Sequence, residues 1–412
     1  MGSNVWLANS RQLVAVSVFA LLGAACSGDD SSPRSSTTPG VPAATPPLPA
    51  ALSATFSDWP NTDFTRTTVN LGEVSRGCPV RDCIPALDAQ DAVTIPSTRG
   101  GHARFAPATA VSYAPRLPVA VVTVGSVTKA YPLHILTWHE VVNDTFGDLP
   151  VVVSFCPLCN TAISFDRRVE GRTLDFGVSG NLRNSDLIMW DRQTESWWQQ
   201  ATGEGIAGAN AGQRLRPLST TVVSFADFAR AHPDGLVLTE DTGLGREYGI
   251  NPYEGYDGSS RPFLFSGKID PRLPGLERVV ALGRDGDGTA VAMSALAPLK
   301  VVNLTVEQVP IAVFWAAGTV SVLDAQSIEN AKDIGSAAAY LAELDGRVLR
   351  FRPGPSGGTF IDEQTGSSWN ILGIATAGEL RGRQLASVLH TTEFWFAWAA
   401  FHPKTQLWTA PG

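Results

Sequence analysis

Short apolar runs bounded by turn residues make up most of the chain. Residues 119–124 and 151–155 are rich in β-branched side chains, and residues 161–165 continue this pattern, which is typical of buried strands. Residues 131–143 instead carry apolar side chains at helical spacing and predict a short helix that ends in a turn at Asn143 and Asp144. The pattern predicts an α+β, β-rich fold of mostly antiparallel strands with short helices.

The order of these patterns occurs twice along the chain. Four segments of the first half have counterparts in the second: residues 150–153 and 310–313, 170–176 and 345–351, 191–198 and 362–369, and 224–233 and 394–403. Self-similarity of this kind indicates repeated structural units. We therefore predict two tandem related units, at residues 56–255 and 256–412, of which the second is degenerate.

Residues that recur in both units are expected to serve the fold. They are Trp198 and Trp369 in the core, Asp191 and Thr194 with their counterparts in a turn, and His232 and His402 at helix ends. The chemically capable residues do not recur, because Ala-Ala-Gly at residues 316–318 stands where the first unit has Cys156 and Cys159. We therefore expect the first unit to carry the functional site.

The chain begins with the features of a bacterial export signal. Arg11 precedes an uncharged apolar stretch, residues 13–25, that is too short to span a bilayer. The small residues 23–25 followed by Cys26 resemble the lipobox of bacterial lipoproteins, in which the cysteine is lipidated. Residues 1–26 are therefore interpreted as a lipoprotein signal peptide with lipidation at Cys26. An ordinary secretory signal with an incidental cysteine is the alternative.

The next segment supports membrane anchoring. Residues 27–55 consist mostly of Ser, Thr, Pro, Ala and Asp and predict a disordered tether. Ser27, directly after Cys26, resembles the signal for sorting to the outer membrane. The predicted location is the cell envelope, with a lipid anchor in the outer membrane and the folded part in the periplasm or on the cell surface. The membrane is thus the one partner that we predict.

Composition narrows the functional classes. The 412 residues are 44% hydrophobic and 17% charged, which indicates a folded protein with a substantial core. A net charge of -8 and a pI of about 5.3 argue against nucleic acid as a partner, because phosphate binding needs clustered Lys and Arg. The sequence also contains no phosphate loop, dinucleotide fingerprint or serine-hydrolase elbow.

Export changes the interpretation of the four cysteines that follow Cys26. Cys78 and Cys83 enclose a short loop and are predicted to form a disulfide, since the compartment is oxidising. A contribution of this pair to a metal site is the alternative.

The second cysteine pair is the main candidate for chemistry. Cys156 and Cys159 are three positions apart on a turn between two predicted strands, an arrangement that lets two thiolates face one ion. His139 is the candidate third ligand, with His134 or Glu140 as a fourth. Thiolates with imidazole suit a transition metal, zinc or copper.

Two other interpretations of this pair remain open. The first is a thiol-disulfide oxidoreductase with Cys156 as the attacking thiol, although residues 161–165 predict a strand where such enzymes have a helix. The second is a structural cysteine pair in a scaffold or interaction protein.

A polar cluster marks a possible ligand cleft. Arg183, Asn184, Ser185 and Asp186 lie on a Gly-rich segment that is shorter in the second unit, and Glu140 is a further candidate for the cleft. A solvated hairpin loop is the alternative.

Several motifs together resemble a known family. They are residues 131–133 (Tyr-Pro-Leu), 138–144 (Trp-His-Glu-Val-Val-Asn-Asp), 155–159 (Phe-Cys-Pro-Leu-Cys), 184–187 (Asn-Ser-Asp-Leu) and 191–194 (Asp-Arg-Gln-Thr). This combination resembles the bacterial and archaeal family called domain of unknown function 3179. The family usually has Gly after the second cysteine, where this chain has Asn160. The resemblance implies the domain and the place of the site, and no particular activity.

Overall fold

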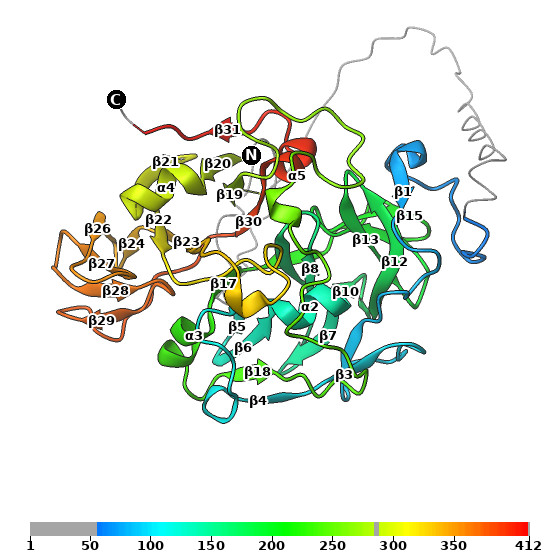
Figure 1. Ribbon diagram of the computed structural model, residues 1–412, viewed down its shortest axis with the longest axis horizontal. Helices are drawn as coiled ribbons and strands as arrows, with labels where there is room; N and C mark the ends of the chain where they lie inside the picture. Colours follow the sequence, from blue (N-terminus) through cyan, green and yellow to red (C-terminus); the bar gives the residue numbers. More distant parts are fainter. Residues whose placement is uncertain (1–55, 284–287, 411–412) are drawn as a thin grey trace, which may run out of the picture.

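The computed structural model describes residues 56–283 and 288–410 (Figure 1). The predicted signal peptide, the tether and Cys26 lie outside these residues. Among the helices that are described, none has the length and apolar character needed to cross a bilayer.

The first half of the chain forms two sheets around α2 (Leu133–His139). One has the order β16 (Arg216–Leu218), β9 (Thr161–Asp166), β8 (Leu149–Cys156), β7 (Val141–Phe146), β2 (Leu87–Ala89) and β3 (Gly101–Ala103). The other has the order β17 (Thr220–Ser224), β5 (Pro118–Val124), β6 (Val127–Pro132), β18 (Leu236–Leu238) and β4 (Phe105–Pro107). The predicted strands at 119–124, 151–155 and 161–165 are thus β5, β8 and β9.

A third sheet completes this half. Its order is β1 (Val74–Arg76), β12 (Phe176–Arg183), β13 (Asp186–Asp191), β14 (Trp197–Gln199) and β15 (Glu204–Ala207). The small hairpin of β10 (Arg168–Val169) and β11 (Arg172–Thr173) connects it to β9.

The second half is built from smaller sheets. One has the order β30 (His390–Phe394), β19 (Arg278–Leu282), β20 (Thr289–Ala292) and β31 (Gln406–Leu407). Another contains β21 (Val301–Val306), β22 (Val309–Ala316) and β23 (Ser336–Leu341), and a two-stranded one contains β24 (Glu343–Leu344) and β25 (Arg347–Val348). The last has the order β26 (Phe351–Pro353), β27 (Thr359–Asp362), β28 (Ser368–Asn370) and β29 (Ala375–Ala377). Figure 1 shows β22 to β29, in yellow to orange, on the opposite side of the molecule from β12 to β15.

Most of these pairings are antiparallel, as predicted, and the protein is β-rich with short helices. The parallel pairs are β2 with β3, β2 with β7, β6 with β18, and β20 with β31. The remaining helices are α3 (Phe225–Ala231), α4 (Met293–Leu299) and α5 (Trp395–Phe401), with the 3₁₀ turns η1 (Leu71–Glu73), η2 (Ala108–Ala110), η3 (Tyr256–Gly258) and η4 (Ile328–Asn330).

The helix predicted at residues 131–143 is shorter than its apolar spacing indicated. It ends at His139 because Glu140 adopts a φ of 56°, which stops helical hydrogen bonding. Asn143 and Asp144 do not form a turn but lie buried in β7, where the β-branched Val141 and Val142 favour a strand. The helix-end positions of His232 and His402 are confirmed, since these residues cap α3 and α5.

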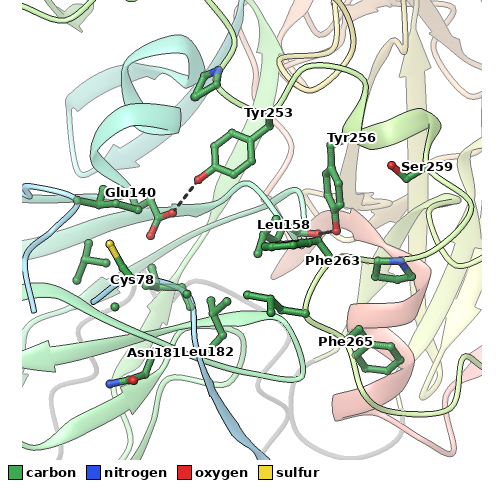
Figure 2. A pocket seen from close by; sticks show the side chains of 18 of the residues that line it. Cys78, Glu140, Leu158, Asn181, Leu182, Tyr253, Tyr256, Ser259, Phe263 and Phe265 are labelled. Atoms are coloured by element: carbon green, nitrogen blue, oxygen red, sulfur yellow. Dashed lines mark hydrogen bonds between the residues drawn. The ribbon is translucent and has the colours of Figure 1, made fainter. Parts of the chain in front are cut away.

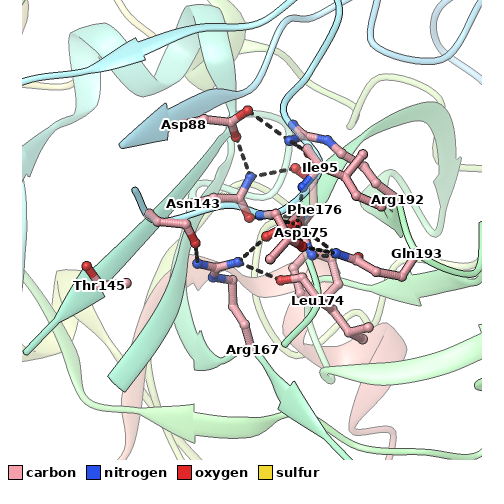
Figure 3. A network of polar contacts seen from close by, with 12 residues as sticks. Asp88, Ile95, Asn143, Thr145, Arg167, Leu174, Asp175, Phe176, Arg192 and Gln193 are labelled. Atoms are coloured by element: carbon pink, nitrogen blue, oxygen red, sulfur yellow. Dashed lines mark hydrogen bonds and ion pairs between the residues drawn. The ribbon is translucent and has the colours of Figure 1, made fainter. Parts of the chain in front are cut away.

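A buried ion pair ties the sheets of the first half together (Figure 3). Nη1 of Arg167 donates to Oδ1 of Asp175 at 2.6 Å, and neither side chain is exposed. Other guanidinium nitrogens donate to backbone carbonyls, among them those of Ala92 and Val151. Val151 belongs to β8, Ala92 lies in the loop before β3 and Asp175 is the residue just before β12, so Arg167 holds these three parts of the chain together.

A long connection joins the two halves and crosses their boundary. Residues 239–277 contain no strand longer than an isolated bridge and only the 3₁₀ turn η3. Asp257 in η3 accepts from Arg278 at 2.8 Å and from Lys332 at 2.9 Å, both in the second half. Because of these contacts, the connection is held as a defined structure between the halves.

Candidate functional site

The turn between β8 and β9 holds the two candidate thiols. Cys156 pairs with Thr161 across the hairpin, so residues 157–160 form its loop. Asn160 has a φ of 53°, a left-handed conformation that Gly adopts freely and that Asn tolerates better than most residues. The turn therefore accepts Asn160 at the position where the family usually has Gly.

Both thiols are free and completely enclosed. Cys156 is 1% exposed and Cys159 is 0% exposed. The backbone carbonyl of Ser185 accepts from the Sγ of Cys159 at 3.4 Å and from that of Cys156 at 3.8 Å. The hairpin turn at residues 184–185, between β12 and β13, thus sits directly against the cysteine turn.

Asp186 brings a carboxylate to the same place. A carboxylate oxygen of Asp186 and the two sulfur atoms all lie within 4.8 Å of one another, and the three residues are buried. The carboxylate is oriented by Gln199, whose Nε2 donates to Oδ2 at 2.6 Å, and by the backbone N–H of Ala201 at 2.9 Å. Two cysteine sulfurs, which bind as thiolates, and one carboxylate oxygen form a set of ligand atoms that suits a transition metal.

The thiols lie near buried acidic side chains. Burial raises the pKa of Cys156, and the nearby carboxylates of Asp186 and Glu140 raise it further. Burial also raises the pKa of Cys159 well above its ordinary value, with additional contributions from Cys156, Asp186 and Glu393. Both sulfurs are therefore protonated at neutral pH unless a cation stabilises their thiolate forms.

The structure does not bring His139, the predicted third ligand, to the thiols. Its Nδ1 lies 2.7 Å from the carbonyl oxygen of Pro85 and its Nε2 lies 2.8 Å from the hydroxyl of Tyr248. The carbonyl can only accept, so Nδ1 carries the proton and Nε2 accepts from the tyrosine. Burial lowers the pKa of His139 to about 4, which keeps the ring neutral in this position. Spacing along the chain could not reveal that both nitrogens are used by the fold.

The two candidate fourth ligands are placed differently. His134 points to another part of the molecule, where its Nε2 lies 2.8 Å from Glu240. Glu140 follows the last helical residue of α2 and is 7% exposed, and a hydroxyl hydrogen bond from Tyr253 reaches its Oε1 at 3.4 Å. Burial raises the pKa of Glu140 to about 8, and the charge of Asp186 raises it as well.

Glu140 also lines a cavity of about 770 Å³ (Figure 2). The opposite wall comes from the connection between the halves, through Tyr253, Tyr256, Phe263 and Phe265. Leu158, from the cysteine turn, lines the cavity although neither thiol does, and its carbonyl accepts from Tyr256 at 2.8 Å. The cavity therefore contacts the cysteine turn but does not include its thiols.

The predicted polar cluster at residues 183–186 is divided by the structure. Most of the Gly-rich segment is strand β12, interrupted by a bulge at Gly180, whose φ is 79°. Only Asn184 and Ser185 form a loop, a two-residue turn with positive φ at both positions. Arg183 points away and pairs with Glu73 at 2.8 Å. Of the cluster, Asp186 and the carbonyl of Ser185 face the thiols.

Cys78 and Cys83 form the predicted disulfide. Cys78 lies on the wall of the cavity. The aromatic residues that form the facing wall were not identified in the sequence. The only signal was their high density in residues 248–265, a segment with no regular pattern.

Fold and site together define a β-rich protein with a buried dithiol–carboxylate cluster beside an aromatic cavity. The model of the family described as "Protein of unknown function (DUF3179)" matches residues 81–405, and the chain belongs to this family. Neither the curated proteins nor the solved structures contain a match to the chain.

Proposed function

We propose that the protein binds a transition metal ion, zinc or copper, through Cys156, Cys159 and Asp186. The observation that carries the proposal is the convergence of three buried ligand atoms within 4.8 Å. Two sulfurs bound to one tetrahedral zinc ion are separated by about 3.8 Å, since each Zn–S bond is about 2.3 Å long. Small side-chain rotations would therefore be enough to bring these atoms to one ion.

Electrostatics supports a cation at this position. Acidic groups that are buried together cost free energy because each disfavours ionisation of the others. A divalent ion reverses this effect and stabilises both thiolates and the carboxylate. The oxygen of Asp186 favours zinc over copper(I), which prefers sulfur ligands alone. In this proposal Asp186 takes the role that the sequence assigned to His139.

Metal analysis of the mature protein tests the proposal. We expect about one equivalent of zinc or copper after anaerobic purification, and loss of the metal in Cys156→Ser and Cys159→Ser. His139→Gln is the control and should retain the metal, because both ring nitrogens of His139 bond elsewhere. A metal-free parent protein that cannot be loaded with either ion would refute the proposal.

Thiol-disulfide exchange is the second candidate function. The proximity of two free thiols on one turn favours it. Their raised pKa values oppose it, since the thiolate is the attacking species. A Cys156–Cys159 disulfide that forms and is reduced reversibly in metal-free protein, measured by mass shift after alkylation, would favour exchange over metal binding.

We also propose that the protein is a lipoprotein of the cell envelope, anchored through Cys26. The support is the sequence of residues 1–55, together with a Cys78–Cys83 disulfide that suits an oxidising compartment. Membrane fractionation of the parent and of Cys26→Ala tests this assignment, with release of the variant from the membrane as the expected result.

We further propose that the chain consists of two related units. The support lies in matched details of the two halves. Asn143 exchanges two hydrogen bonds with the backbone of Phe176, and Asn303 does the same with Phe351. Glu140 and Lys300 end α2 and α4 with φ of 56° and 63°. Such agreement in local geometry is expected if both halves descend from one ancestral unit.

A further inference from the structure

The cavity beside the cysteine turn has the size and wall of a ligand site. Its volume of about 770 Å³ falls within the range of small-molecule sites. Most of the wall is apolar, with Ile84, Val178 and Leu187 among its residues. None of Cys156, Cys159 and Asp186 lines it, so the cavity is a feature separate from the proposed metal site.

Glu140 is the buried acidic group of this cavity. Within the described part of the chain it forms no ion pair, and its hydrogen bond from Tyr253 is long, at 3.4 Å. Ionisation of a carboxyl group held away from water without a cation costs several kcal/mol, on the order of the penalty for one buried ion, and this cost favours the protonated form of Glu140. A ligand that carries a positive charge would offset this cost and stabilise the carboxylate form of Glu140.

Aromatic rings line the cavity from the position of Glu140 to its other side (Figure 2). Figure 2 shows Tyr253 with its hydroxyl directed at Glu140 and Tyr256 beside it. Phe263 is 58% exposed and Phe265 follows it on the same wall. Rings of this kind attract ammonium groups through their negative faces and also provide apolar contact for the body of a ligand.

The remaining charged residues of the wall lie toward solvent. Arg261 and Glu254 are both exposed, which leaves Glu140 as the buried ionisable group of the cavity wall. Leu264 between the two phenylalanines has a φ of 55°, a left-handed conformation that costs a residue with a β-carbon about 1 kcal/mol. Strain of this kind is common in segments that hold a binding site.

We propose that this cavity binds an organic amine, with the ammonium group at Glu140 among the tyrosine rings and an apolar body against the phenylalanines and leucines. A buried carboxylate and an aromatic wall are the two features by which proteins recognise such cations. The inference does not depend on the metal, because none of the three proposed metal ligands lines the cavity.

A series of probes of equal length tests the proposal. Binding of 4-phenylbutylamine, 4-phenyl-1-butanol and 4-phenylbutanoate to the mature protein is measured by isothermal titration calorimetry. We expect the amine to bind about tenfold or more tightly than the alcohol, the size of one charge-assisted hydrogen bond, and the carboxylate to bind most weakly. Equal affinities, tighter binding of the carboxylate, or no binding of the amine at millimolar concentration would overturn the proposal.

Two variants separate the charge from the fold. Glu140→Gln should remove the advantage of the amine and leave the affinity for the alcohol within about twofold. Lys300→Gln, at the same kind of helix end in the other half, is the matched control and should leave both affinities unchanged. If Glu140→Gln binds the amine as tightly as the parent does, the proposal is wrong.

One further variant keeps this test independent of the metal. Cys156→Ser should lose the metal and retain the preference for the amine. If the parent protein retains the metal but shows no preference for the amine, the cavity proposal is refuted and the metal proposal is not affected.

Discussion

The carboxylate of Asp186 and the sulfur of Cys159 are neighbours although they come from two different sheets. Asp186 begins β13, and Cys159 lies in the turn between β8 and β9. The contact exists because the two-residue turn before Asp186 places the carbonyl of Ser185 against both thiols. This relationship makes Asp186 the residue on which the metal proposal is most sharply tested.

Replacement of Asp186 by Asn should weaken metal binding. The asparagine amide keeps the shape of the aspartate side chain and can still contact Gln199, but it removes one anionic oxygen ligand. We expect the dissociation constant for zinc to rise about 100-fold or more, since even indirect ligand partners change it by about 10- to 100-fold. Competition with a chromophoric chelator measures it. If Asp186→Asn leaves the zinc affinity unchanged while Cys159→Ser loses zinc binding, Asp186 is not a ligand.

Removal of Arg167 should destabilise the first half strongly. Arg167→Met leaves the Asp175 carboxylate buried without its partner, which costs roughly 3–5 kcal/mol. Urea denaturation followed by tryptophan fluorescence measures the change. Arg383→Gln is the control: its partner Asp345 is exposed, and we expect an unchanged midpoint. Equal midpoints for both variants would contradict the role of Arg167.

Asn143 and Asn303 offer a matched comparison of the two halves. Each amide closes two hydrogen bonds to the backbone of a phenylalanine. Asn143 is fully buried, whereas Asn303 is partly exposed, so water can replace the lost bonds only in the second half. We expect Asn143→Ala to cost about 2–3 kcal/mol and Asn303→Ala about 1 kcal/mol. A larger effect at Asn303, measured by thermal unfolding, would contradict this reasoning.

Asp257 should make stability depend on pH in the acidic range. Burial raises its pKa, but the charge of Arg278 and hydrogen bonds from Ser321, Arg278 and Lys332 outweigh burial and lower it. A lowered folded-state pKa contributes stability above the unfolded value of about 3.9, and this contribution is lost as the pH falls through the folded value. We therefore expect the unfolding free energy to fall below about pH 4.

Asp257→Asn tests this expectation. The variant should be less stable at pH 7 by roughly 3 kcal/mol, because Arg278 loses its buried partner, and its stability should fall less steeply below about pH 4. Chemical denaturation across pH measures both effects. The same acid dependence in parent and variant would assign it to other carboxylates.

Asn160 should tolerate glycine better than alanine. Its φ of 53° suits Gly, so Asn160→Gly should change stability by less than about 0.5 kcal/mol, whereas Asn160→Ala should cost about 1 kcal/mol. Thermal unfolding distinguishes the two. A larger cost for Gly than for Ala would show that the Asn160 side chain, and not its backbone, supports the turn.

Local patterns were sufficient for much of the fold. The strands β5, β8 and β9 and the cysteine hairpin follow from β-branched runs and turn residues, because these preferences act between neighbours in the chain. The Cys78–Cys83 disulfide was also predictable from the short separation of the two cysteines and from the predicted export of the chain. The end of α2 was not predictable from local patterns, since the positive φ of Glu140 depends on how β7 pairs with β8.

The sequence by itself determined that two thiols share one turn. It also predicted a β-rich, exported protein. Only the tertiary structure decided which groups surround the thiols. His139 is close to them along the chain and yet bonds to Pro85 and Tyr248, whereas Asp186 reaches them from another sheet. The aromatic wall of the cavity likewise comes from the connection between the halves. Spacing in sequence governs contacts within one element, but contacts between sheets depend on how the whole core packs.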